Sequence, residues 1–304
     1  MREKTFISRH SRTSSKISIL LVTKNRPALL KSCLRSIAEQ SLKPDELVIV
    51  DSSNKPVIDI IRSFDKKLGF LYEYNPHYTI PQARNRCIDL ASYNMLLFID
   101  DDCTAEKHWV KKMIDFYQKF HNAHLISGKV IHVPTSSIYS LIIRTIRKNR
   151  MKLAKKKGKN IYINIENCIL PKHWLLKNKI RFDERMLHED FIDIVLQILN
   201  KHGNIISDTS TIVYHHERET LWKFLRQRFK NSGNTIRLSH KWKSKEFYFY
   251  GSQREKYIMS FVELLTYLYK KRQVLKILQM IIIVFLSVAI YELGYLYHKY
   301  IVKT

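Results

Sequence analysis

The chain has 304 residues, of which 45% are hydrophobic, and 53 lysines and arginines against 27 acidic residues give it a formal net charge of +26. This size and apolar content suffice for one large α/β domain or for a domain with an appendage. The four cysteines are scattered without a C-x-x-C pair, which argues against a disulfide framework and fits reduced thiols in the cytosol. No internal repeat of solenoid period is present. The charge favours anionic partners, such as phosphates, acidic lipids or nucleic acid.

Strands and helices are expected to alternate after a polar, basic tail over residues 1–16, which lacks the apolar run of a secretory signal. Short apolar runs predict strands over 17–23, 47–50, 70–74, 95–99 and 123–130. Helical periodicity predicts helices from Pro27 to about 37, over 57–64 and 81–91, and from about 105 to 120. This alternation is typical of βαβ units and predicts a mostly parallel sheet.

The pattern changes in the second half of the chain. Arg144–Lys159 carries nine lysines and arginines in sixteen residues and no acid, which predicts an exposed, mobile basic segment. A helix is expected from Glu189 to just before Gly203. A short strand over 211–214 is expected to run into His215 and His216, and from about residue 221 the chain is expected to be helical and basic.

An apolar run lies near the C-terminus. Ile277–Tyr291 is uncharged over 15 residues, or about 22 Å of helix, against a hydrocarbon core of roughly 30 Å. The run reaches Tyr297 if Glu292 is accepted. Three placements are open, namely a membrane span, an in-plane anchor and a buried core helix. Four cations between residues 270 and 276 would keep the main domain of a spanning protein on the cytoplasmic face.

Three carboxylates, Asp100, Asp101 and Asp102, directly follow the strand predicted over 95–99. Ligands bind at the carboxyl ends of strands in open α/β sheets, and adjacent carboxylates repel one another unless a cation lies among them. Hard oxygen ligands suit Mg²⁺ or Mn²⁺, which usually bridge to a substrate phosphate. The alternative is that these residues and Thr104 cap a helix beginning near Ala105.

Several segments together resemble one known family. They are ISILLVTKNRP, VIVDSSN, IPQARNRCIDLA, MLLFIDDDCTAEKHWV, RFDERMLHEDFIDIVLQILNKHG and TIVYHHE, in that order along the chain. The chain resembles the family 2 glycosyltransferases over roughly residues 17–217. The resemblance implies an inverting enzyme of the GT-A fold, with a Rossmann-like, mostly parallel sheet flanked by helices. Residues 218–304 would form a helical, basic C-terminal region with a membrane-associating helix at about 277–297.

The resemblance also assigns a nucleotide-binding set at the strand ends. The residues expected to line the base, ribose and diphosphate are Thr23, Asn25, Arg26, Asp51, Arg84, Asp100 and Asp101. A carboxylate at Asp51 can accept from a uracil or thymine ring N–H, and the guanidinium of Arg84 can donate to phosphate oxygens. Taken alone, Asp51 also fits a turn residue and Arg84 a surface arginine.

A Mn²⁺ or Mg²⁺ ion is expected between protein and donor. By resemblance Asp102 is its ligand, and Asp100 contacts either the ribose or the metal through water. His215 occupies a slot where some family members place a further ligand, and His216 is a second candidate. A histidine in this place is also compatible with a purely structural role.

The acidic pair Glu189-Asp190 occupies the position of the family's acceptor-side motif. An inverting transfer needs one base to remove the acceptor hydroxyl proton. Asp190 matches that position best, with Glu189 as alternative or partner, and Asp193 lies one turn further on. The alternative is that the acids stabilise the first turn of a helix.

Two departures from the family pattern narrow the expected function. The segment Thr79-Ile80-Pro81 stands where the family often has glycine. The proline makes this loop stiffer than a glycine would. Arg226–Phe229 is not the Q-x-x-R-W motif of processive members, so transfer of a single sugar is expected.

The expected function is therefore transfer from a nucleotide-sugar donor of the UDP or dTDP type to a lipid-linked or cell-surface glycan acceptor. It would take place at an anionic membrane surface on the cytoplasmic face, without nucleic acid as a partner. One rival is a sugar-nucleotide pyrophosphorylase, which usually has a glycine-rich loop that Thr23–Pro27 lacks. The other is a non-catalytic protein that binds nucleic acid or anionic lipid, although no nucleic-acid motif accompanies the charge.

Overall fold

The computed structural model describes residues 2–4, 16–64, 66–135, 137–156, 163–186, 190–216, 220–242 and 254–301. The chain divides into two compact units. The first comprises Met1–Ile131, Tyr162–Arg185 and Gln197–His216, and the second comprises His132–Ile161, Met186–Leu196 and Glu217–Thr304. The last boundary falls close to the end of the expected transferase domain, but the second unit also takes in two segments from within it.

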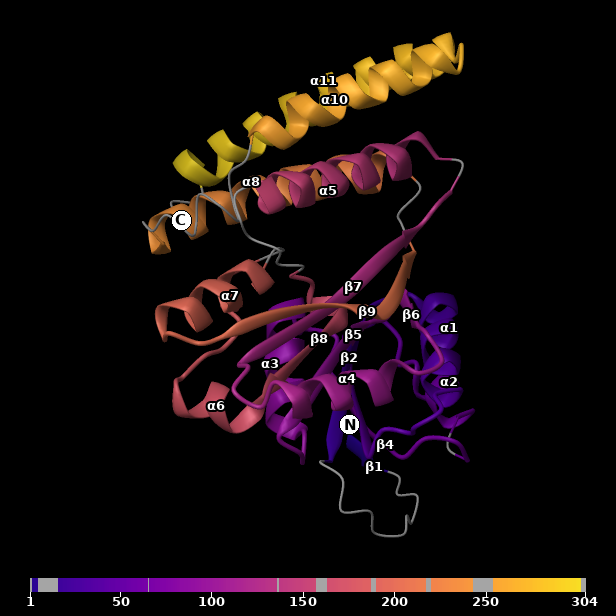
Figure 1. The fold of residues 1–304 in the computed structure, drawn as a ribbon, viewed down its shortest axis with the longest axis vertical. Coiled ribbons are helices and arrows are strands. Elements are labelled where there is room, and N and C mark those ends of the chain that lie inside the picture. Colours follow the sequence, from indigo (N-terminus) through magenta and orange to yellow (C-terminus); the bar gives the residue numbers. More distant parts are fainter. Residues whose placement is uncertain are drawn as a thin grey trace. The chain divides into compact units, whose positions relative to one another are not determined.

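A mixed sheet forms the centre of the first unit (Figure 1). Its strands are β1 (Arg2–Lys4), β2 (Ile17–Thr23), β3 (Glu46–Asp51), β4 (Phe70–Tyr74), β5 (Met95–Asp100), β6 (Cys103–Ala105), β7 (Leu125–Val133), β8 (Cys168–Pro171) and β9 (Ile205–His216). They lie in the order β1-β4-β3-β2-β5-β8-β7-β9-β6. The central strands β4, β3, β2 and β5 are parallel, which confirms the predicted βαβ arrangement. β1, β8 and β6 pair antiparallel with their partners.

Helices occur in both units. The first unit contains α1 (Pro27–Ala38), α2 (Ile58–Arg62), α3 (Ile80–Leu90), α4 (Trp109–Lys119), α6 (Lys172–Lys177) and a short 3₁₀ turn at Ile165–Asn167. The second contains α5 (Ile138–Lys156), α8 (Leu221–Lys241), α10 (Arg254–Lys270), α11 (Val274–Leu296), a π turn at Tyr297–Ile301 and most of α7 (Asp190–Asn200). The helices α1 to α4, α7 and those after residue 220 correspond to predicted helices, whereas α5 and α6 are not predicted from the sequence.

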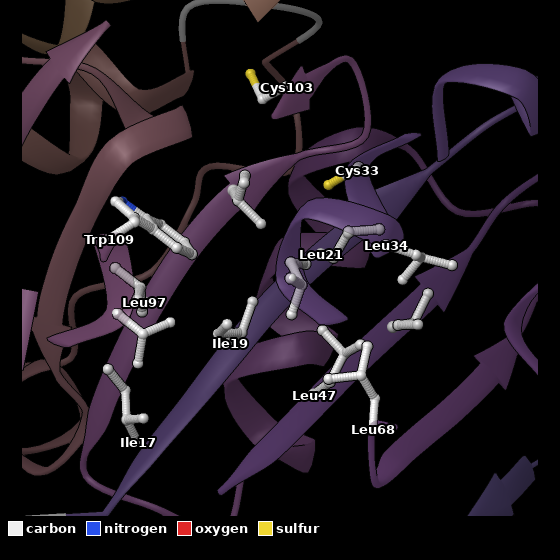
Figure 2. Packing of buried hydrophobic residues seen from close by; sticks show 14 of the residues in the cluster. Ile17, Ile19, Leu21, Cys33, Leu34, Leu47, Leu68, Leu97, Cys103 and Trp109 are labelled. Carbon is white, nitrogen blue, oxygen red and sulfur yellow. The ribbon is translucent and has the colours of Figure 1, made fainter. Parts of the chain in front are cut away.

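Strand alternation builds the core of the first unit. Ile17, Ile19 and Leu21 on one face of β2 pack in a single buried cluster with the apolar stripe of α1, which includes Cys33 and Leu34 (Figure 2). The same cluster takes in α2 and α4. Alternate side chains of a strand point to opposite faces, so the other face of β2 and β3 is left for α3, which contacts both strands. Helices therefore cover both faces of the sheet, as a parallel sheet requires.

The helix-cap alternative for the aspartate triplet is wrong. Cys103–Ala105 is the strand β6, which pairs antiparallel with β9, and the next helix begins only at Trp109. The backbone of this segment forms hydrogen bonds to β9 and therefore does not form the predicted helix. Asp100 therefore ends β5, and Asp101 and Asp102 form the short connection to β6.

Two further expectations need correction. Residues 144–156 continue the helix α5, in which Lys148 and Lys152 are exposed, but Asn149 is buried and donates to Ser260 Oγ at 3.1 Å. The apolar positions interleaved with the cations give this stretch a face that packs on α10. In the N-terminal tail, Arg2–Lys4 forms β1 against β4. The rest of that tail up to residue 15, and residues 157–159, lie outside the described residues.

Candidate functional site

Polar side chains gather at the carboxyl ends of β2 and β5. These strands are neighbours, and their register places Val22 opposite Asp100. Both strands end at this point. β2 continues into the loop before Pro27, and β5 ends in the aspartate triplet. The expected residues Thr23, Arg26 and Asp100–Asp102 are therefore brought to one edge of the sheet.

Asp101 and Asp102 are held by groups from the loop after β2. Thr23 Oγ1 donates to Asp101 Oδ2 at 2.8 Å. Arg26 Nη1 donates to Asp101 Oδ1 at 2.9 Å and to Asp102 Oδ2 at 2.6 Å. One guanidinium thus bridges two neighbouring carboxylates and reduces their mutual repulsion.

Burial is the largest influence on the pKa values of both Asp101 and Arg26. It raises the pKa of the Asp101 carboxyl to about 6, an effect that Arg26 opposes and Asp102 reinforces. Burial alone would lower the pKa of Arg26, but Asp101 and Asp102 together raise it. Asp101 acts as a buried anchor for Arg26, whereas Asp102 faces other groups as well.

Asp102, Cys103 and His215 form a second cluster of potential ligand atoms, all within 4.8 Å of one another. The antiparallel β6–β9 pair places Cys103 opposite His215, and the His216 N–H donates to the Asp102 carbonyl at 2.9 Å. His215 Nε2 lies 3.4 Å from Asp102 Oδ1. Two of the three residues predicted as metal ligands, Asp102 and His215, are therefore neighbours, whereas the third, Asp100, is paired with Arg84.

This donor set fits a divalent cation. Burial, followed by the charge of Asp102, raises the pKa of the Cys103 thiol well above its ordinary value. Hard cations such as Mn²⁺ and Mg²⁺ prefer oxygen and nitrogen donors to a soft sulfur. Asp102 and His215 remain as one oxygen and one nitrogen donor. Mn²⁺ accepts such a mixed pair, and so few protein ligands leave coordination positions for phosphate oxygens and water.

Arg84 projects from the first turns of α3 toward the same edge. Its Nη2 donates to Asp100 Oδ1 at 3.0 Å, and its guanidinium lies 5.6 Å from the centroid of the Phe182 ring. Thr79 caps the helix by accepting from Gln82 N–H, and Pro81 fits the first turn. Capping thus fixes the helix that carries Arg84, although Thr79-Ile80-Pro81 departs from the family pattern.

The loops after β2 and β3 are joined side by side. Asn25 adopts a left-handed backbone with φ 57°, and its N–H donates to Ser53 Oγ at 2.8 Å. The Asn54 N–H in turn donates to Asn25 Oδ1 at 2.9 Å. An asparagine tolerates this backbone better than most residues, so Asn25 shapes the loop that carries Arg26.

Asp51 is fully buried at the end of β3. Its carboxylate accepts from the N–H groups of Ser53 and Val57 at 2.8 and 2.9 Å, and from the Tyr72 hydroxyl at 2.8 Å. These contacts match the turn role that the sequence left open. Its contact with a nucleotide base stays a prediction.

The predicted acceptor-side residues lie in another part of the chain. Asp190 is the first residue of α7, is buried and belongs to the second unit, while Glu189 lies outside the described residues. Asp193 is fully buried and accepts from Trp242 Nε1 at 2.6 Å and from Lys241 Nζ at 2.8 Å. It therefore ties α7 to the end of α8.

Sequence reasoning missed the partners of several of these groups. Asn85, the last residue of A-R-N, exchanges hydrogen bonds with the backbone of Phe182 and donates to Glu184 Oε1 at 3.0 Å. This asparagine fixes the start of the segment that leads to Asp190. Tyr72 had no motif to mark it, because only the alternation of β4 distinguishes it from Tyr74.

Comparison with known proteins supports the resemblance. The family model described as glycosyl transferase family 2 matches residues 18–178. A PGL/p-HBAD biosynthesis glycosyltransferase of Mycobacterium tuberculosis is 34% identical over 118 residues, which are 38% of this chain and 46% of that protein. The validoxylamine A glucosyltransferase of Streptomyces hygroscopicus subsp. limoneus is 30% identical over 103 residues, 32% of this chain and 23% of that protein. The aligned parts thus span less than half the length of these relatives.

The fold has a solved counterpart. Residues 1–349 of S. aureus TarS, solved in complex with UDP-GlcNAc, superpose with a TM-score of 0.52 at 17% identity. The match covers 93% of this chain and 91% of that one, and it shows a shared fold. With more than half of its residues matched by the family model, the chain belongs to glycosyl transferase family 2.

Proposed function

We propose that the protein transfers one sugar from a nucleoside-diphosphate sugar, of the UDP or dTDP type, to a lipid-linked or cell-surface glycan acceptor, with inversion at the anomeric carbon. The observation that carries the proposal is the cluster of Arg26, Asp101, Asp102 and His215 at the carboxyl edge of the sheet. The guanidinium groups of Arg26 and Arg84, together with a metal ion that Asp102 and His215 would hold, fit the charge of the donor's diphosphate. TarS, which shares the fold, was solved with UDP-GlcNAc.

The donor's diphosphate needs compensation of its negative charge. Arg84 and Arg26 both stand at this edge, paired with carboxylates that keep them in place. A Mn²⁺ or Mg²⁺ ion held by Asp102 and His215, with Asp100 nearby, would supply Lewis-acid stabilisation to the departing nucleoside diphosphate. Arg84, ordered by Asp100 and Phe182, would donate to phosphate oxygens.

The acceptor must lose a proton as it reacts. In the proposed step the Asp190 carboxylate takes the proton from an acceptor hydroxyl. The hydroxyl oxygen forms a bond to the anomeric carbon on the face opposite the departing phosphate. The bond from that carbon to the phosphate oxygen breaks, and its electron pair leaves with the nucleoside diphosphate.

A membrane acceptor is supported by the C-terminal region. Residues 274–301 form a helix with a mean hydropathy of 2.4 in its most apolar window, of which only 17% is buried. A soluble core helix would be mostly buried. The net charge of +26 fits an anionic surface. Together these features support membrane association of the enzyme, which in this proposal acts on the cytoplasmic face.

The proposal can be tested with purified full-length protein and a panel of nucleotide sugars. We expect release of nucleoside diphosphate from a UDP- or dTDP-sugar with Mn²⁺, and a loss of at least about 100-fold in Asp102→Asn. Asp115→Asn is the matched control, because Asp115 is an exposed carboxylate paired only with Lys111 among the contacts given for it. Failure of every donor to bind or turn over, with or without metal, would overturn the proposal.

A further inference from the structure

The second unit contains a four-helix core formed by α5, α8, α10 and α11. Its buried cluster comprises Ile142, Phe224, Leu264, Leu268, Met280 and Ile283. α10 contacts α5, and α11 contacts α8, α5 and α10 (Figure 1). The long apolar helix α11 is thus part of a folded bundle, and one stripe of it is already used.

The opposite stripes of α10 and α11 remain exposed. We call this surface the outer face, and it is represented by Ile258 and Val262 on α10 and by Leu275, Leu278, Ile282 and Phe285 on α11. Each of these side chains is between 54% and 76% exposed. On α11 the outer positions recur at helical spacing opposite the buried Met280, Ile283 and Ser287. So many large apolar side chains exposed on two neighbouring helices are uncommon on a soluble monomer and mark an interaction site.

The inner stripe of α11 packs closely on α8. A Cβ on Gly294 would lie 2.4 Å from Ser232 Oγ, and a Cβ on Gly233 would lie 2.6 Å from the His298 ring. The Tyr291 hydroxyl donates to Thr235 Oγ1 at 3.1 Å. The two helices therefore meet through small residues along several turns, and α11 does not leave the bundle without losing these contacts.

The composition of α8 decides how α11 can meet a membrane. α8 carries Lys223, Arg226, Arg228, Lys230 and Arg237 and contains no acidic residue. If α11 crossed the bilayer, the α8 cations packed beside it would enter the hydrocarbon, where each charge is strongly unfavourable. If α11 lies parallel to the surface, α8 stays on the water side of it. The packing therefore favours the in-plane orientation.

Charge at the end of the hairpin identifies the occupant of the outer face. Lys270 ends α10, Lys271 and Arg272 lie in the turn before α11, and Lys276 follows within the first turn of α11. All four are exposed. Exposed cations beside an apolar face complement anionic headgroups above acyl chains. A protein partner would match the apolar surface, but this combination fits an anionic lipid leaflet better.

We infer that the outer face of α10 and α11 is embedded in one leaflet of an anionic membrane, with α11 parallel to the surface and not across the bilayer. This inference rests on the second unit alone and is independent of the donor chemistry proposed above. It deepens the membrane association of that proposal by giving it a surface and an orientation.

A flotation experiment tests the surface. The full chain is mixed with vesicles of phosphatidylcholine and phosphatidylglycerol, and with vesicles of phosphatidylcholine alone. We expect binding to the anionic vesicles to fall at least about tenfold in the double variant Ile282→Asp/Phe285→Asp. Leu176→Asp, at an exposed leucine of α6 in the first unit, is the matched control and should bind normally. Unchanged binding of the double variant, or no binding by the parent chain, would overturn the inference.

A depth measurement tests the orientation. Single cysteines are introduced at Leu275, Phe285 and Leu296 and labelled with an environment-sensitive dye; the four native cysteines are buried. Lipid-borne quenchers at defined depths then locate each dye. Equal, shallow depths at all three positions are expected. A dye at position 285 near the bilayer centre, with the other two near opposite surfaces, would show a spanning helix and refute the in-plane orientation.

Discussion

His215 Nε2 lies 3.4 Å from Asp102 Oδ1, across the antiparallel pairing of β6 and β9. The carboxylate and the imidazole come from distant parts of the sequence, and the short strand β6 is what brings them together. Asp102 also accepts from Arg26, so the same carboxylate contacts both a guanidinium and the imidazole of the candidate metal pair. The strand pairing therefore determines the composition of the candidate metal site.

Replacement of His215 should weaken metal-dependent donor binding. In His215→Asn we expect UDP affinity to fall about 10- to 100-fold in the presence of Mn²⁺ and to change little in the presence of a chelator, because the imidazole would act only through the metal. Calorimetric titration of UDP under both conditions measures this. His216→Asn is the control, since its backbone contact with Asp102 is kept. A loss in His216→Asn but not in His215→Asn would move the ligand by one residue.

Replacement of Asp190 should affect the chemical step. Asp190→Asn keeps the shape of the side chain but cannot accept the acceptor proton, so kcat should fall by about 10²- to 10⁴-fold. Donor affinity, measured by UDP titration, should stay within about twofold. Near-normal kcat in this variant, together with an inactive Glu189→Gln, would assign the base to Glu189 instead.

The central strands and the first helices could be predicted from the sequence. β2, β3 and β5 are continuous apolar runs, and α1 shows one clear apolar face after Pro27, so a local pattern suffices for each. The aspartate triplet could also be placed at a strand end. The neighbourhood of Thr23, Arg26 and Asp101 follows from two adjacent parallel strands ending at one edge.

Long-range pairing explains what the sequence could not show. β6 has only three residues and no apolar run, so it resembled the start of a helix, and only its bonds to β9 make it a strand. The sequence predicts an exposed segment for the basic stretch of α5 because its charges outnumber its apolar residues. Its partners on α10, such as Ser260 and Glu263, lie more than a hundred residues away.

Loss of the Tyr72 hydroxyl should destabilise the loop after β3. Burial, then the hydrogen bond to Asp51, raises the pKa of Tyr72, so the hydroxyl remains a donor at all ordinary pH values. Tyr72→Phe leaves one buried carboxylate oxygen with one donor fewer and should cost about 1.5–3 kcal/mol in the free energy of unfolding.

Tyr74→Phe is the matched control for that variant, because the Tyr74 hydroxyl makes an exposed bond to the Asn54 carbonyl. Denaturant unfolding compares the two, and equal costs would contradict the anchoring role of Asp51. The predicted base contact is tested separately by Asp51→Asn, which should narrow the preference for UDP over CDP, since cytosine lacks the ring N–H.

The pH dependence of stability should report the ion pair at Glu73. Arg86 Nε and Nη2 each donate to this carboxylate at 2.8 Å, and the buried Glu73 also pairs with Arg2. The hydrogen bond from Arg86 lowers the pKa of Glu73 below its ordinary value, so folding favours the ionised form. This contribution is complete above the unfolded pKa, about 4.3, and is lost as the pH falls through the lower folded value. Glu73→Gln should therefore lower Tm at pH 7, and its difference from the parent chain should shrink as the pH falls below about 4.

Asp59→Asn, at an exposed carboxylate, is the control for this variant and should show little difference from the parent chain at either pH. A Glu73→Gln difference that stays constant down to pH 3 would mean that packing, and not charge, makes this residue stabilising.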